Sequence, residues 1–359
     1  MTLVTKMNSI HKITLKIQFL NTHIQELMRN IFLLLIFISI TLLSHGQQFN
    51  YAHDNPIELG KVNWIRNYDE ALKKAEKDNK PVFILFQEVP GCGNCTKYGR
   101  DILSHPLIVE AIEDEFIPLA IYNNKKGHDR EVLNHFGEPT WNNPVVRFTN
   151  PNGGLVGKRI ADFRSTSQLL EAMISVLKKE KRKVPTYLSL LAEENRAIEK
   201  GTDEFFLSMY CFWTGEKEIA KLDGVIGTEA GFMHGNEVVK VKYDGTQTDM
   251  WKISQKAAQV NCGDKVFTDK KAKTNLPTKK IGKYRKDSQD KYYLLHSALR
   301  AIPMTEYQKM KVNSALGSRK DPSHYLSPRQ LKLSSKENNT ANFIEEEFVT
   351  SWYTAVGER

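Results

Sequence analysis

The chain has 359 residues, of which 40% are hydrophobic and 26% are charged. This is the composition of an ordinary globular protein, and it excludes a mostly disordered chain, a collagen-like fibre and a protein with many membrane spans. The length exceeds what one compact domain usually needs, so we expect two domains. Lys and Arg number 51 against 42 Asp and Glu, a formal net charge of +9. That charge favours contact with polyanions but identifies no partner.

An apolar segment near the N-terminus predicts export. Arg29 precedes the uncharged apolar run 31–43, and the small residues Ser44 and Gly46 follow. A charged start, a short apolar core and a small-residue exit are typical of a secretory signal peptide, and the run is short for a membrane span. We expect cleavage after Gly46, loss of residues 1–46, and a periplasmic or secreted mature protein. An uncleaved N-terminal anchor is the alternative.

The next part of the chain alternates helical and strand-like patterns. Apolar spacing predicts a helix that follows the cysteine pair and ends near residue 103, and further helices at 68–79, 107–115, 131–136 and 167–179. The last of these has Ser165 or Thr166 as its predicted N-cap. Apolar runs predict strands at 82–86, 117–122, 145–148 and 156–161. This alternation predicts a three-layer α/β domain, which we assign to residues 47–183.

A basic run at 178–183 and Pro185 mark the end of this domain. Because no aromatic residues interleave the run, we interpret it as a solvated helix end and expect no nucleic-acid partner. A linker at 184–202 carries a predicted helix, 188–200, into the second domain, 203–302. There the patterns predict strands at 205–210, 225–232 and 237–243. They also predict one helix that follows Trp213 and ends at 222, and two more at 250–258 and 287–302. The extension 303–359 mixes short helical signals with polar loops and suggests no chemistry.

Four cysteines lie beyond the predicted cleavage site: Cys92, Cys95, Cys211 and Cys262. A disulfide-stapled scaffold has many cysteines in a short chain, whereas these are sparse in a chain long enough to build hydrophobic cores. Chemical use of the sulfurs therefore explains them better than stapling does.

Cys92 and Cys95 lie at the junction of a predicted strand and a predicted helix. The backbone N–H groups and the dipole at a helix N-terminus favour a thiolate there, and a thiol one turn later is within disulfide reach. This predicts Cys92 as the attacking sulfur and Cys95 as the resolving one. Two other interpretations stay open. One is a zinc site, for which Cys211 and Cys262 are too isolated to form the second ligand pair, and the other is a structural disulfide.

The segment around this pair resembles the thioredoxin-like superfamily over residues 60–180. The shared features, in order, are Lys80-Pro81-Val82 before the strand, the CGNC turn and Pro144 at the start of a later strand. The resemblance implies a thioredoxin-like α/β fold in which Pro144 follows a cis peptide bond and packs beside the active pair, where substrate binds. The chain departs at Gly91, where the family often has Trp.

A second group of motifs follows Tyr210, in the order Cys211-Phe212-Trp213, Gly224-Val225 and Glu237-Val238-Val239. Over 205–245 these resemble an A-type peptide methionine sulfoxide reductase, and 287–294 (DSQDKYYL) faintly resembles a tyrosine-rich motif near that family's end. The resemblance implies an α+β two-layer domain with Cys211 as nucleophile and Glu237 as the acid. Tyr210 replaces the family's glycine, and Phe232 stands where the family has a substrate-binding tyrosine.

Reduction of a sulfoxide needs a nucleophile for sulfur, a proton donor for the departing oxygen and an apolar recess for the S-methyl group. Cys211 is the predicted nucleophile, and Phe212 and Trp213 are the predicted recess. Attack leaves Cys211 as a sulfenic acid, which a second thiol must condense with. Cys262 is the other cysteine of this domain and is therefore the candidate resolving residue.

The sequence thus predicts an exported enzyme that reduces methionine sulfoxide in proteins, with Cys211 as nucleophile and the Cys92/Cys95 dithiol as internal reductant at high effective concentration. Its expected partners are oxidised or disulfide-bonded proteins and an upstream thiol reductant, with no metal or cofactor and with membrane contact only through the signal segment. Two alternatives remain. One is a protein-disulfide reductase or isomerase whose C-terminal domain is a catalytically degenerate module that binds client proteins. The other is a binding module whose thiols are idle.

Overall fold

The computed structural model describes residues 28–29, 51–52, 54–141, 144–260, 263–271, 273–334 and 341–357. Backbone contacts divide the chain into two units, Met1–Asn50 and Tyr51–Arg359. The predicted signal segment 31–43, its cleavage site and Cys262 lie outside the described residues. Within the described part, no helix has the length and apolar character to cross a membrane.

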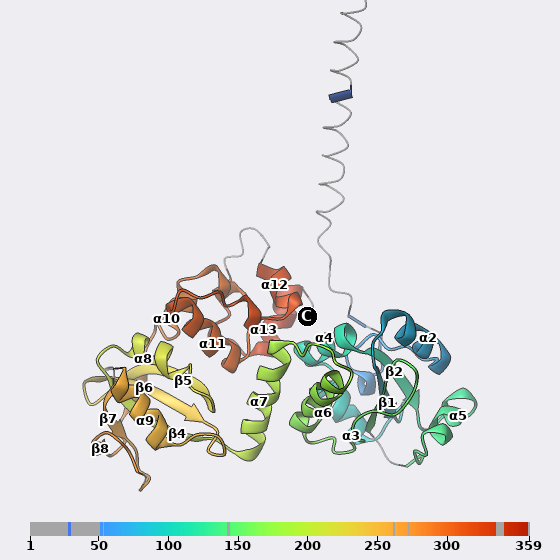
Figure 1. The fold of residues 1–359 in the computed structure, drawn as a ribbon, viewed down its shortest axis with the longest axis horizontal. Helices are drawn as coiled ribbons and strands as arrows, with labels where there is room; N and C mark the ends of the chain where they lie inside the picture. The colour runs from blue at the N-terminus through green and yellow to red at the C-terminus, as the bar shows by residue number, and fades with distance from the viewer. Residues whose placement is uncertain are drawn as a thin grey trace, which may run out of the picture. The chain divides into compact units, whose positions relative to one another are not determined.

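The first half of the larger unit is built around a three-stranded sheet (Figure 1). Its elements are η1 (Ile57–Leu59), α2 (Tyr68–Asp78), β1 (Val82–Gln87), α3 (Gly93–Asp101), α4 (Pro106–Glu115), β2 (Ile117–Tyr122), α5 (His128–His135), β3 (Val145–Thr149) and α6 (Thr166–Lys179). The strand order is β2-β1-β3, with β1 parallel to β2 and antiparallel to β3. Single bridges extend the sheet, from Ile65 to Leu119 on one side and from Ile160 to Val146 on the other.

The strand predicted at 156–161 does not form as a ladder. Instead, Leu155 and Ile160 each make one bridge to β3. The central strand β1 is buried at all six positions, which agrees with its unbroken apolar run. Ser165 caps α6 by accepting a hydrogen bond from the backbone N–H of Gln168, so the first of the two predicted caps is correct.

Helix α7 (Thr186–Lys200) contacts α4 and α6 of this half and β5 and α11 of the other. Its range includes that of the helix predicted at 188–200, and it lies between the two sheets in Figure 1.

A six-stranded sheet follows α7. Its elements are β4 (Asp203–Met209), α8 (Phe212–Ile219), β5 (Val225–Met233), β6 (Asn236–Tyr243), α9 (Met250–Gln259), β7 (Gly263–Phe267), β8 (Thr278–Lys279) and β9 (Tyr284–Lys286). The strand order is β8-β7-β4-β6-β5-β9, and all pairs are antiparallel except β7 with β8. Helix α8 packs on β4, β5 and β6, so the C-terminal half is a mixed helix and sheet structure.

The helix predicted at 287–302 is broken into a turn, α10 (Tyr292–Leu295) and η2 (Ala298–Ala301). The break is at Lys291, whose φ of 56° is left-handed and cannot continue a right-handed helix.

The extension forms α11 (Glu306–Gly317), η3 (Ser323–Tyr325), α12 (Pro328–Ser334) and α13 (Phe348–Val356). It packs back on the first half of the unit. Arg329 pairs with Glu113 of α4 at 2.6 Å, and the hydroxyl of Tyr353 donates to the carbonyl of Ser104 at 2.6 Å. The extension is therefore part of the folded core.

Candidate active site

Cys92 and Cys95 lie where the buried strand β1 gives way to helix α3. Cys92 is the N-cap of α3, and Cys95 lies in its first turn. Their Sγ atoms are 3.5 Å apart, which places both thiols within reach of a disulfide after a small movement. Cys92 is exposed and Cys95 is buried. An incoming sulfur can therefore reach Cys92 first.

The two thiols have different acidities. Burial acts to raise the pKa of Cys92, but hydrogen bonds from the backbone of Cys95, from the Cys95 thiol and from the backbone of Asn94 outweigh it, so the pKa lies below its ordinary value. Burial raises the pKa of Cys95 to about 12. The contrast favours Cys92 as the attacking thiolate and Cys95 as the protonated, shielded partner.

A layer of polar groups supports the turn from beneath. The side-chain amide of Gln87 donates to the carbonyl of Glu58 at 2.7 Å and to the carbonyl of Cys95 at 3.1 Å. The backbone N–H of Gly91 donates to a carboxylate oxygen of Glu58 at 2.7 Å. Glu58 and Gln87 are both buried and were not predicted as site residues. The one sequence signal was a polar Gln at the end of the apolar run of β1.

The second thiol site lies at the start of α8. Cys211 is the N-cap of this helix and is half-buried. The backbone N–H of Phe212 donates to the Glu237 carboxylate at 3.0 Å, although these residues are 25 positions apart. The structure therefore places the predicted acid, Glu237, at the same helix end as the predicted nucleophile, Cys211.

Aromatic rings adjoin this helix end. Phe212 is buried, and its ring centroid lies 5.4 Å from that of Trp213 and 5.3 Å from that of Phe232. Trp213 stacks on Tyr292 of α10 at 4.0 Å, and its indole N–H lies 3.4 Å from a carboxylate oxygen of Asp287. The two aromatic residues predicted for the substrate recess, Phe212 and Trp213, are thus in one cluster with Phe232.

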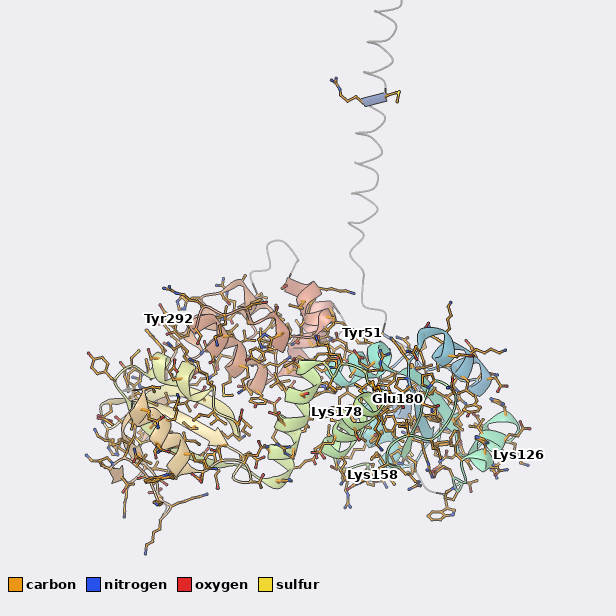
Figure 2. All side chains as sticks on the ribbon, viewed as in Figure 1. Tyr51, Lys126, Lys158, Lys178, Glu180 and Tyr292 are labelled. Atoms are coloured by element: carbon orange, nitrogen blue, oxygen red, sulfur yellow. The ribbon has the colours of Figure 1, made fainter. Side chains whose placement is uncertain are left out.

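Residues from the last strand of the sheet and the segment after it complete the cluster. Tyr292, labelled in Figure 2, and Asp287 belong to the 287–294 motif, which the sequence singled out without assigning roles. The Arg285 guanidinium lies over the ring of Phe232, 4.4 Å from its centroid. No pattern in the sequence indicates a role for Arg285.

A buried charged network anchors the 287–292 segment against α8. The ammonium of Lys291 lies 2.8 Å from the Glu216 carboxylate and 3.0 Å from the Asp290 carboxylate, and it also donates to the carbonyl of Thr228. Burial raises the pKa of Glu216, whereas the two carboxylates raise the pKa of Lys291 against the effect of its own burial. The network fixes Asp287 and Tyr292 against Trp213 through the backbone they share.

Comparison with known proteins finds a family for the segment that carries the first of these two sites. Residues 63–151 match a family described as thioredoxin-like, and this range contains the Cys92/Cys95 turn, the strands β1, β2 and β3, and Pro144. The segment is a thioredoxin-like domain. No curated protein sequence matches the chain.

Solved structures similar to part of this chain include a thioredoxin from Thermus thermophilus, with 23% identity over 33% of this chain and 89% of that chain and a TM-score of 0.29. A DsbH oxidoreductase has 19% identity over 35% of this chain and 93% of that chain, with a TM-score of 0.28. A putative disulphide-isomerase from Bacteroides thetaiotaomicron has 21% identity over 34% of this chain and 96% of that chain, with a TM-score of 0.27.

Gly91 is the position at which this chain departs from the thioredoxin-like family. A Cβ atom at Gly91 would lie 2.3 Å from the carbonyl oxygen of Glu88 and 2.6 Å from the Cβ of Cys95, so no side chain fits there. This explains why the chain has no Trp before its first cysteine.

Pro144 is buried directly before β3, but Asn143 and the bond between them lie outside the described residues, so the predicted cis bond stays a prediction.

The two thiol sites belong to different sheets of the unit. The dithiol of the thioredoxin-like domain follows β1, whereas Cys211 follows β4. Gly263, which comes directly after Cys262 in sequence, pairs with Met209, two residues before Cys211. Cys262 itself lies outside the described residues, and its resolving role stays a prediction.

Proposed function

We propose that this chain is a thiol oxidoreductase that reduces methionine sulfoxide in proteins at Cys211 and draws its electrons from the Cys92/Cys95 dithiol. The thioredoxin-like domain supports the redox part of this proposal. The observation that supports the sulfoxide chemistry is the hydrogen bond from the Phe212 N–H to Glu237, which brings a carboxyl group to the helix end that carries Cys211.

The reaction uses these groups in sequence. The Cys211 thiolate attacks the sulfoxide sulfur while Glu237 donates a proton to the oxygen, which moves to Cys211 and leaves a thioether and a sulfenic acid. The Phe212, Trp213 and Phe232 rings receive the S-methyl group, since aromatic contacts with sulfur are favourable. Cys262 then condenses with the sulfenic acid, so that water leaves and a Cys211–Cys262 disulfide forms.

The reduced dithiol closes the cycle. The Cys92 thiolate attacks the Cys211–Cys262 disulfide, and Cys95 resolves the mixed disulfide, so that two thiols are restored and a Cys92–Cys95 disulfide is formed. An external dithiol reduces that disulfide. Export by the 31–43 segment stays a prediction, and with it the periplasmic or secreted location of this cycle.

A peptide assay tests the sulfoxide step. Wild type is supplied with dithiothreitol and with peptides that carry each sulfoxide epimer, and thioether is measured by mass spectrometry. Cys211→Ser should abolish turnover, and Glu237→Gln should lower kcat by about 10²- to 10⁴-fold, the range of a lost general acid. Glu204→Gln, an exposed carboxylate on β4, is the matched control and should be neutral. Turnover by Cys211→Ser at the wild-type rate would show that the proposal is wrong.

Mixed variants test the internal relay. With a reductant that recharges only the thioredoxin-like pair, Cys92→Ser and Cys211→Ser should each be inactive alone. Activity of an equimolar mixture that rises with protein concentration indicates transfer between molecules, whereas no recovery indicates transfer within one chain. Full activity of Cys92→Ser under the same reductant would remove the dithiol from the cycle.

A second candidate function is protein-disulfide reduction or isomerisation through Cys92 and Cys95, with the C-terminal half serving to bind client proteins. The exposure of Cys92 favours it, because a bulky disulfide substrate can reach that sulfur while Cys211 is half-buried. Reactivation of a protein with scrambled disulfides distinguishes the two. This function requires that Cys92→Ser loses the activity and that Cys211→Ser keeps it.

A further inference from the structure

Three potential metal ligands converge at the start of α3. One carboxylate oxygen of Glu88 and the Sγ atoms of Cys92 and Cys95 all lie within 4.8 Å of one another. Across the described residues, no other three His, Cys, Asp or Glu side chains come together in this way. Glu88 is half-buried, Cys92 is exposed and Cys95 is buried, so the group opens to solvent on the Cys92 side.

The spacing suits a tetrahedral thiophilic cation. Zinc–sulfur bonds are about 2.3 Å long, so a metal bonded to two sulfurs 3.5 Å apart has an S–metal–S angle of about 100°, near the tetrahedral value. Two thiolates and one carboxylate are ligand types that Zn²⁺ accepts, and three protein ligands leave a fourth position for water or an outside thiol.

We propose that the reduced pair, together with Glu88, binds Zn²⁺ or a cation of similar softness and is thereby held in the reduced, inactive state. The sequence alone offered no second cysteine pair to complete a zinc site. The structure supplies a carboxylate instead, from the residue that directly follows β1. Its place at the end of a fully buried strand gives the ligand a fixed backbone position.

Binding couples the metal to the redox state. Each thiol loses its proton as its metal–sulfur bond forms, so two protons leave and no electron is transferred. The oxidised pair has no thiolate to offer, because both sulfurs are bonded to each other. A cation that binds only the reduced form displaces the redox equilibrium toward it, by about a hundredfold at a free concentration one hundred times Kd.

The test uses the full chain, reduced with a phosphine and titrated anaerobically with Co²⁺ and then with Zn²⁺. Wild type should take up one Co²⁺ with thiolate-to-cobalt charge-transfer bands and strong visible bands of a tetrahedral ion, and Zn²⁺ should remove both. Cys92→Ser and Cys95→Ser should lose the spectrum. Glu88→Gln should bind at least about tenfold more weakly, the scale of a lost supporting group, and Glu88→Asp should recover part of the loss.

Controls separate this site from others on the chain. Glu171→Gln, an exposed carboxylate on α6, and the double variant Cys211→Ser/Cys262→Ser should bind as wild type does. Zn²⁺ should also slow alkylation of Cys92 in wild type. Equal affinity of Glu88→Gln and wild type, binding by the oxidised protein, or loss of binding in the double variant would each overturn the proposal. Because the readout is binding, the outcome is independent of sulfoxide reduction.

Discussion

The indole N–H of Trp352 donates to the hydroxyl of Tyr51 at 2.7 Å, across 301 positions of sequence. Trp352 is fully buried in α13, and Tyr51, labelled in Figure 2, is 2% exposed. The bond joins the first described residue of the larger unit to its last helix. This bond therefore joins the extension, for which the sequence suggested no role, to the segment that leads into the thioredoxin-like domain.

Tyr51→Phe should lower the free energy of unfolding by about 1–3 kcal/mol, because it leaves the buried Trp352 N–H without this acceptor. Urea denaturation followed by tryptophan fluorescence measures the change. Tyr210→Phe is the matched control, since that hydroxyl is on a side chain that is 94% exposed, and it should change stability by less than about 0.5 kcal/mol. Equal stability of the two variants would contradict this role for the bond.

Gly91→Ala should destabilise the thioredoxin-like domain and displace Cys95, since the new methyl group would lie 2.6 Å from its Cβ and 2.3 Å from the Glu88 carbonyl. Strain of this kind typically costs about 1–3 kcal/mol. Gly93→Ala is the control, because nothing lies within 4 Å of a Cβ built there, and a helical Gly→Ala change is neutral or stabilising. Thermal unfolding and the rate of Cys92 alkylation are the measurements. If both variants behave alike, the close approach at Gly91 is unimportant.

Local patterns predicted much of the thioredoxin-like half. The unbroken apolar run of β1, the Ser165 cap and the cysteine pair at a strand-to-helix junction depend on neighbours in sequence, so the sequence was enough to place them. The approach of Glu237 to α8 was predicted only through the resemblance, because a hydrogen bond over 25 positions has no local signature.

The errors and omissions come from long-range contacts. The segment 287–302 has helical spacing, yet the Lys291 side chain bonds to Glu216, 75 positions earlier, and the backbone at Lys291 turns left-handed. In the same way, the Arg329 guanidinium donates to the Glu113 carboxylate, 216 positions earlier, and no pattern in 303–359 predicts this contact. Contacts of this kind depend on how the two sheets and α7 pack, and the residue pattern of one segment does not predict that packing.

Lys291→Met should destabilise the C-terminal half by about 3–5 kcal/mol, because removal of one member of a buried charged network leaves the Glu216 carboxylate without its counter-ion and leaves Asp290 with Lys286 at 3.6 Å. Adding Glu216→Gln to Lys291→Met should recover part of the loss. Lys221→Met, which breaks a surface pair with Glu218, should cost less than about 1 kcal/mol. Urea unfolding of the three variants measures these differences. No recovery in the double variant would argue against charge as the cause.

The buried carboxyl of Glu110 on α4 predicts a pH dependence of stability. Glu110 is 0% exposed, and burial raises the pKa of its carboxyl from 4.5 to about 7. A hydrogen bond from Ser327, the backbone N–H of Arg329 and the charge of Arg329 act to lower this pKa, whereas the charge of Asp114 acts to raise it. Between these two values the folded state holds a proton that the unfolded state has released. The free energy of unfolding contributed by Glu110 therefore falls as pH rises through this window, by about 3 kcal/mol in all, and is constant above it.

Glu110→Gln should remove this contribution, because the amide stays neutral and its oxygen can still accept the 2.8 Å hydrogen bond from the Arg329 N–H. Urea unfolding at pH values from about 4.5 to about 8, across the titration window, gives the difference in unfolding free energy between wild type and variant. As pH rises, the free energy of unfolding of Glu110→Gln should increase relative to that of wild type. The free energy of unfolding of Glu171→Gln should follow that of wild type throughout. Parallel profiles for wild type and Glu110→Gln would show that folding does not raise the pKa of the Glu110 carboxyl.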